Sequence, residues 1–122
     1  MRLHEKLDVW KKAIDFVVEI YRMTETFPTE EKFGLTSQIR RASVSIPANI
    51  AEGAGRESDK DYIRFLSIAQ GSTSEVETEL LIANRLGFLS NQNYKTARAS
   101  LDEIGRMNTG LANHLRRKST GM

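Results

Sequence analysis

The sequence predicts an all-α protein, an antiparallel four-helix bundle in up-down-up-down order. Apolar residues recur with the helical period through most of the 122 residues, and no stretch keeps up the alternation of a β-strand. The pattern is broken only briefly, at residues 27–29, 53–58 and 87–90. Short connections between long helices place consecutive helices side by side and in opposite directions.

The composition is that of one globular domain. A length of 122 residues fits a single domain, 1–122, in which we expect the last few residues to form a flexible tail. Charged residues make up 28% of the chain and hydrophobic residues 39%, which argues against disorder. There is no cysteine, no apolar run as long as a membrane span, and no apolar block of a signal peptide at the start. We therefore expect a cytoplasmic protein with no membrane partner.

We expect helices at residues 5–26, 30–54, 59–87 and 91–117. A hydroxyl side chain stands at the start of each of the last three, at Thr29, Ser58 and Ser90. Such a side chain can accept a hydrogen bond from a free backbone amide in the first helical turn. These three residues are therefore the expected N-caps.

The first expected helix is apolar over a wide arc. Two stripes at helical spacing run along it and together cover roughly 200° of its circumference. One stripe contains Leu7, Trp10, Ile14, Val17 and Tyr21, and the other contains Val9, Ala13, Phe16, Ile20, Met23 and Phe27. A helix on the surface of a single bundle needs only about half of that width. We therefore favour burial of the extra face against another subunit over the alternative, a broad core within one chain.

Pro47 lies in the middle of the second expected helix. Proline removes one backbone hydrogen bond, and its ring presses on the carbonyl four residues earlier, at a cost of roughly 3 kcal/mol. We expect a kink at Pro47 that re-aims the second half of the helix. The hydroxyls of Ser43 and Ser45 are candidates to bond backbone groups near the kink.

A polar stripe follows one flank of the same helix. Its members recur at steps of three or four residues and therefore share that flank: Gln38, Arg41, Ser45, Asn49, Glu52 and Arg56. We favour a hydrogen-bonded network between helices or subunits, because buried polar groups must find partners. The alternative is a binding face for an anionic ligand, with Arg41 and Arg56 supplying the guanidinium groups.

The third expected helix combines small residues with acidic ones. Gly71, in the run A-Q-G-S-T-S at 69–74, costs about 1 kcal/mol in a helix interior, which close packing of a facing helix would offset. Glu75 and Glu79 lie on one face, as carboxylates do in di-iron bundles, but the Glu-x-x-His partners of those sites are absent. We therefore expect a solvated or ion-paired face and no metal or other cofactor.

Positive charge is concentrated in the last quarter of the chain. Residues 91–122 carry six basic and two acidic side chains, although the whole chain has a net charge of only +2. The candidate nucleic-acid-binding residues are Arg106, Arg116, Arg117 and Lys118. Clustered basic groups attract the phosphates of nucleic acids. The alternative is that cations at the end of a helix only complement its dipole.

Residues for catalysis are scarce. The two histidines, His4 and His114, stand near opposite ends of the sequence, and no cysteine nucleophile exists. No Ser–His–Asp arrangement is indicated either. The sequence gives no support to an enzyme, and we expect none.

Several segments resemble a known family. They are L-D-V-W-K-K-A (7–13), F-G-L-T-S-Q-I-R-R-A (33–42), S-I-P-A-N-I-A-E-G-A-G-R (45–56) and F-L-S-I-A-Q-G-S-T-S-E-V-E-T-E-L (65–80). With these segments the chain resembles the four-helix-bundle proteins encoded in intervening sequences of 23S ribosomal RNA genes. The most specific part is the signature S-I-P-x-N-I-A-E-G. The family is in turn similar to accessory proteins of diversity-generating retroelements.

The resemblance implies a four-helix bundle that assembles into a homo-oligomeric ring, with five subunits as the expected number. The similarity to the retroelement proteins suggests binding of structured RNA or DNA through a basic surface. No catalytic residue and no small-molecule substrate are implied. The first hypothesis is therefore a non-enzymatic oligomer that binds nucleic acid. The alternative is an oligomeric scaffold for another protein, with no nucleic-acid role.

Overall fold

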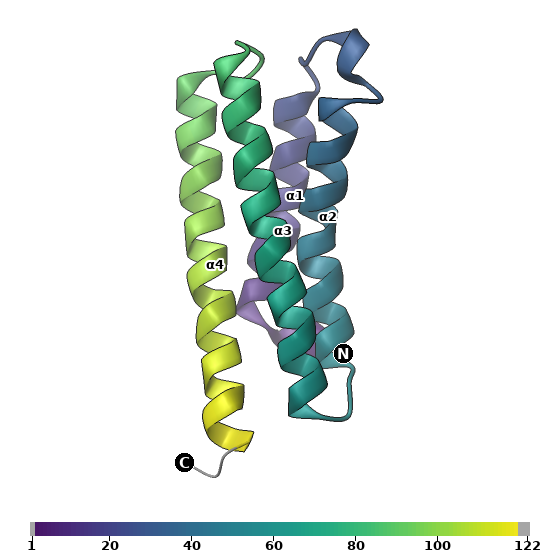
Figure 1. Cartoon of the computed structure of the whole chain (residues 1–122), viewed down its shortest axis with the longest axis vertical. Coiled ribbons are helices and arrows are strands. Elements are labelled where there is room, and N and C mark those ends of the chain that lie inside the picture. The colour runs from purple at the N-terminus through teal and green to yellow at the C-terminus, as the bar shows by residue number, and fades with distance from the viewer. Residues whose placement is uncertain (1, 120–122) are drawn as a thin grey trace.

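The structure, a computed structural model, describes residues 2–119 and confirms the all-α bundle (Figure 1). Its α-helices are α1 (Asp8–Thr24), α2 (Leu35–Ala54), α3 (Asp59–Arg85) and α4 (Asn91–Ser119). Two short 3-10 helices, η1 (Leu3–Lys6) and η2 (Thr29–Glu31), precede α1 and α2. Consecutive α-helices run in opposite directions, and both α1 and α3 pack against α2 and α4. Residues 2–119 contain no β-strand.

Two helices begin later than the sequence predicts. Leu7 has an extended backbone (φ −81°, ψ 124°), which separates η1 from α1 within the expected helix 5–26. The second helix, expected from residue 30, begins at Leu35 because Gly34 leaves the helical conformation (φ −109°, ψ −116°). The Leu35 amide donates instead to Glu31 Oε1 at 3.0 Å, and Thr29 opens η2 rather than capping α2.

The other two caps are confirmed. Ser58 Oγ accepts a hydrogen bond from the Asp61 amide, and Ser90 Oγ accepts one from the Asn93 amide, both at 3.1 Å. The last helix continues to Ser119, beyond its expected end at residue 117. The rest of the expected tail, residues 120–122, lies outside the described residues.

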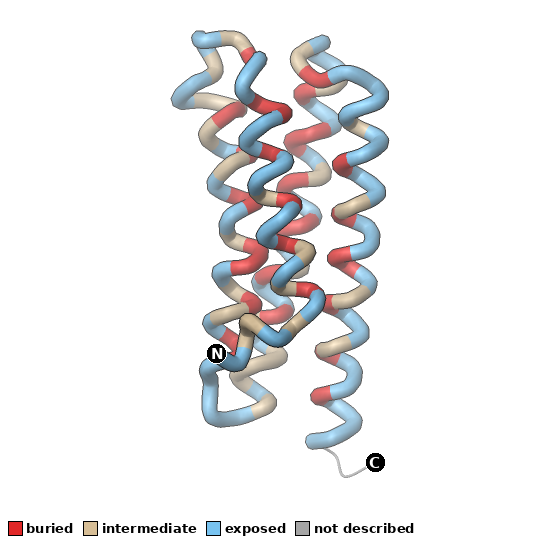
Figure 2. Tube along the Cα trace, turned by 180° about the vertical axis from the view of Figure 1, so that it is seen from behind, coloured by how far each residue is buried: buried red, intermediate tan, exposed pale blue. Residues whose placement is uncertain are grey.

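The core lies where the four helices face one another (Figure 2). The large side chains fully enclosed at its centre are Ile20, Ile39, Ile46, Ile50, Leu66, Val76, Leu80 and Ile104. Of the two apolar stripes on α1, the one with Phe16 and Ile20 is buried here. Full burial of such a side chain contributes roughly 1.5–3 kcal/mol, so this stripe holds α1 in the bundle. The other stripe is only partly covered, with Ile14 37% and Tyr21 42% exposed.

The approach of α2 to α3 depends on Gly53. A Cβ atom at this position would lie 3.0 Å from Phe65 Cβ and 3.1 Å from the carbonyl oxygen of Tyr62, both on α3. The close approach predicted at Gly71 is wrong, because a Cβ there would meet no atom within 4 Å. Gly71 is exposed on the outer side of α3.

The kink expected at Pro47 is not confirmed. The second helix is one α-helix from Leu35 to Ala54, and Pro47 is buried on the same side as Ser43 and Ile50. Ser43 Oγ donates to the carbonyl oxygen of Arg40 at 2.9 Å, so this hydroxyl does bond the backbone near the proline. The proline ring is therefore part of the packed interior.

A buried amide joins α4 to α3. Asn108 is 2% exposed, and its Nδ2 donates to the carbonyl oxygen of Leu66 (2.8 Å) and to Gln70 Oε1 (3.0 Å). Gly105, one turn earlier, leaves room for the Gln70 side chain, which would lie 3.2 Å from a Cβ at that position. These contacts fix the register of the two helices.

Candidate functional site

The polar stripe predicted on α2 is connected only in its middle. Ser45 Oγ lies 2.8 Å from Ser72 Oγ of α3, within hydrogen-bond distance. Asn49 Nδ2 donates to the carbonyl oxygen of Ser45 (2.8 Å) and to Ser45 Oγ (2.9 Å). Ser45 and Asn49 are half-buried, and Ser72 is buried. This part of the stripe therefore links α2 to α3.

The two ends of the stripe are on the surface. Glu52 and Arg56 form an ion pair whose side chains are 55% and 40% exposed. At the other end, Gln38 and Arg41 are exposed, and their side chains form no hydrogen bond or ion pair with residues 2–119. Exposed ion pairs contribute only about 0–1 kcal/mol. Within one chain, the six residues of the stripe do not form one hydrogen-bonded network. Whether the stripe is a network completed between subunits or a binding face for an anionic ligand therefore stays a prediction.

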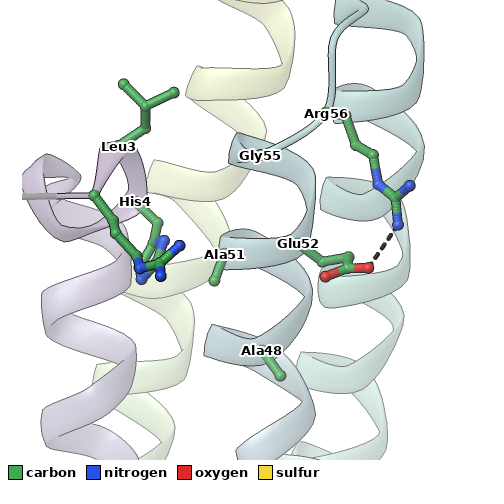
Figure 3. A pocket seen from close by; sticks show the side chains of 8 residues that line it. Leu3, His4, Ala48, Ala51, Glu52, Gly55 and Arg56 are labelled. Atoms are coloured by element: carbon green, nitrogen blue, oxygen red, sulfur yellow. Dashed lines mark hydrogen bonds and ion pairs between the residues drawn. The ribbon is translucent and has the colours of Figure 1, made fainter.

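A hollow of about 710 Å³ lies between η1 and the second half of α2 (Figure 3). The α2 side is formed by small residues, Ala48, Ala51 and Gly55, and His4 comes from η1. The Glu52–Arg56 pair lies on the far flank of α2 from His4 (Figure 3), and Arg56 also stacks over the Phe65 ring at 4.7 Å from its centroid. The charged groups at this hollow thus do not converge on a common point.

The candidate nucleic-acid-binding residues are all exposed on α4: Arg106, Arg116, Arg117 and Lys118. At 1.5 Å per residue they span about 18 Å of the helix. The Arg106 side chain forms no hydrogen bond or ion pair with residues 2–119, whereas Arg116 donates to Asn113 Oδ1 at 2.9 Å. Helical spacing puts Arg106 and Arg117 on one face and turns the other two away from it. The structure thus gathers these cations on one segment but not on one face.

A carboxylate lies beside the last turn of α4. Asp59, at the start of α3, accepts a hydrogen bond from Ser119 Oγ to its Oδ2 at 3.1 Å. Part of the positive field at this end is therefore offset by α3.

Sequence reasoning missed a basic hollow at the other end of the bundle. This hollow, of about 490 Å³, is lined by Lys32 and Phe33 before α2, and by Arg40 and Arg41 within it. Spacing along α2 grouped Arg41 with the polar stripe and left Arg40 out. The spacing of residues does not show which flank of α2 faces α1.

Glu79 departs from the solvated or ion-paired face that the sequence predicts. Glu75 is exposed, but Glu79 is only 7% exposed, and its Oε1 has no hydrogen-bond partner among the described residues. Burial, reinforced by the charge of Glu75, raises the pKa of Glu79 from 4.5 to about 7. The expectation is therefore wrong for this residue, because Glu79 lies on the flank of α3 that packs against α2, two turns along from Ser72.

The described part of the chain contains no group of three or more His, Asp or Glu side chains placed to hold a metal ion. Within residues 2–119, no helix is both long enough and apolar enough to cross a bilayer.

The chain matches the model of a protein family described as 23S rRNA-intervening sequence protein, over residues 5–110. Its fold is similar to a 1.70 Å crystal structure of a protein of unknown function from the S23 ribosomal protein family of Bacteroides thetaiotaomicron VPI-5482. Sequence identity is 27% and the TM-score is 0.77, over 85% of this chain and 97% of the other. No protein of curated function matches. Because the family match spans α1 to α3 and most of α4, the chain belongs to the 23S rRNA-intervening sequence protein family.

Proposed function

We propose that this protein is a non-enzymatic homo-oligomer that binds structured RNA or DNA through contacts to phosphate groups. The observation that supports nucleic-acid binding best is the charge of α4. After Glu103 the sequence contains no acidic residue, and Arg106, Arg116, Arg117 and Lys118 are all exposed. Clustered basic side chains in a segment without acidic residues bind phosphates and release counterions, whatever the base sequence.

The proposed assembly surface is an apolar area on the outer side of α1 and α2, which we name the α1–α2 face. Its residues are Trp10, Ile14, Val17 and Val18 of α1 and Val44, Ala48 and Ala51 of α2. Val18 is 45% and Val44 42% exposed. Arg40 Nη2 donates to the carbonyl oxygen of Tyr21, which sets the antiparallel register of the two helices. An exposed apolar face of this kind supports contact with a second copy of the chain. The ring of five subunits is what the resemblance to the family implies.

Sedimentation at micromolar chain concentration is expected to give a species several times the 13.8 kDa mass of the chain. Ile14→Glu should dissociate it, because the substitution would bury a charge in the subunit contact. Ile68→Glu is the matched control, since Ile68 has similar exposure (44%) but lies on α3, which is not part of the face. A wild-type species with the mass of one chain would exclude the assembly.

Neutralising the α4 cations is expected to weaken binding of a labelled RNA hairpin by at least about tenfold, since each lost phosphate contact removes affinity at every sequence. The variant carries glutamine at Arg106, Arg116, Arg117 and Lys118. The control carries glutamine at four exposed cations on η1, α1 and α3, Lys6, Lys11, Lys60 and Arg85. Both variants have the same net charge, so fluorescence anisotropy separates a local site from a general charge effect.

Equal losses in the two variants would show that α4 is not the binding surface. Assembly of the wild type without any RNA or DNA binding would favour the alternative function, a scaffold for another protein.

A further inference from the structure

The hollow at the start of α2 combines cations with aromatic rings. It has a volume of about 490 Å³ and takes Tyr21 from α1, Lys32 and Phe33 from the connection, and Thr36, Arg40 and Arg41 from α2. No aspartate or glutamate lines it. The connection between α1 and α2 lies at the end of the bundle opposite to the last turn of α4 (Figure 1), so this hollow is separate from the α4 cations.

The cations differ in how they are held. Arg40 stacks over the Tyr21 ring at 4.5 Å from its centroid and donates to Thr24 Oγ1 at 2.9 Å, so its guanidinium is fixed. Arg41 is exposed, and its side chain forms no hydrogen bond or ion pair with residues 2–119. Lys32 makes no ion pair with them and lies 5.5 Å from the centre of the Phe33 ring. Three positive groups therefore border one hollow, and two of them are available to an anion.

Among residues 2–119, Phe33 is the most exposed large apolar side chain, at 90%. Its ring stands between this hollow and a second one of about 490 Å³ on the other flank of α2, which Arg41 also borders. A ring exposed beside unpaired cations can stack on a planar base while the cations bind the attached phosphate. If Phe33 served only as an apolar contact to another subunit, the neighbouring cations Lys32 and Arg41 would have no role in that contact.

The first turn of α2 also borders the hollow, through Thr36 and Ser37. Thr36 is buried, and its Oγ1 has no hydrogen-bond partner among the described residues. The first intrahelical hydrogen bond is donated by the Gln38 amide to the Gly34 carbonyl. The amides of Thr36 and Ser37 come before it and therefore have no acceptor within the helix. The dipole of α2 adds positive potential at the same place.

We propose that this hollow binds a nucleotide, with the base stacked on Phe33 and the phosphate held by Lys32 and Arg41. The nucleotide is either free or part of a single strand, since the two share this chemistry. This proposal is independent of the one for α4. The hollow has no residue in common with the α4 cations and lies at the other end of the bundle.

The test is calorimetric titration of the full chain with adenosine 5′-monophosphate, adenosine, inorganic phosphate and a single-stranded adenosine hexanucleotide. The monophosphate or the hexanucleotide should bind more tightly than adenosine or phosphate. Phe33→Ala should weaken that binding by about fivefold to a hundredfold, and Phe33→Trp should restore it. Arg41→Gln should weaken it by about tenfold. Arg106→Gln, at an exposed arginine of α4 that is likewise unpaired, should leave it unchanged.

Binding of the free monophosphate supports a nucleotide pocket, and binding of the hexanucleotide alone supports a single-strand site. The proposal is overturned if neither binds, if Phe33→Ala and Arg41→Gln leave the affinity unchanged, or if phosphate alone binds as well as the monophosphate. It is also overturned if the two variants change only the sedimenting mass, since the hollow would then be a subunit contact. Because Phe33 and Arg41 are exposed, melting curves should confirm that both variants stay folded.

Discussion

Replacing Glu79 by glutamine is expected to stabilise the fold at pH 8 by up to about 3 kcal/mol and to change little at pH 4. Glu79 is 7% exposed, and its Oε1 has no partner among residues 2–119. An ionised carboxylate in such a place costs free energy, which a neutral amide of the same shape avoids.

The direction of the pH dependence follows from the raised pKa. Burial, with the nearby charge of Glu75, raises the pKa of Glu79 in the folded chain from 4.5 to about 7. Between these two pH values the folded chain keeps a proton that the unfolded chain releases. The free energy of unfolding should therefore fall as the pH rises from about 4.5 to 7 and then level off.

Urea denaturation of wild type and Glu79→Gln at pH 4 and pH 8, at one chain concentration, measures this effect. Glu75→Gln is the control, because Glu75 is exposed and acts on Glu79 only through its charge. It should stabilise much less. A Glu79→Gln variant no more stable than wild type at pH 8 would mean that the carboxylate has a cationic partner in solution.

Gly53→Ala is expected to destabilise the fold by about 1–2 kcal/mol, the net of overpacking and the better helix propensity of alanine. The new Cβ would lie 3.0 Å from Tyr62 Cδ1 and 3.1 Å from the Tyr62 carbonyl oxygen. A backbone carbonyl in the first turn of α3 is held by the helix and cannot move aside cheaply, so α2 and α3 would have to separate.

Gly71→Ala is the matched control for Gly53→Ala, because it makes the same change in a helix with no atom within 4 Å of the new Cβ. It should stabilise by about 0.5–1 kcal/mol. Thermal melts of the two variants should therefore shift in opposite directions. Similar shifts for both would contradict the close contact at Gly53.

Local signals in the sequence predicted the fold best. Ser58 and Ser90 cap their helices as predicted, because a cap involves only a hydroxyl and an amide three residues later. The start of α2 was predicted wrongly because Gly34 and the bond from Leu35 to Glu31 depend on how the chain returns from α1. The close approach was assigned to Gly71 instead of Gly53, since spacing shows that a residue is small but not which helix it faces.

The sequence predicted the candidate site residues correctly only where the charge of a side chain is enough to place it on the surface. The α4 cations are exposed, as four basic residues in a polar segment must be. The burial of Glu79 and the hollow with Lys32, Phe33 and Arg40 depend on how neighbouring helices approach α3 and α2. Helical periodicity carries no information about that approach.

The most direct test of nucleic-acid binding is an anisotropy titration of a labelled RNA hairpin with the wild-type protein at 50 and 200 mM salt. If the four α4 cations each neutralise a phosphate, the affinity should fall by roughly a hundredfold between the two salt concentrations. No binding at 50 mM salt, or an affinity that does not change with salt, would contradict phosphate-mediated binding.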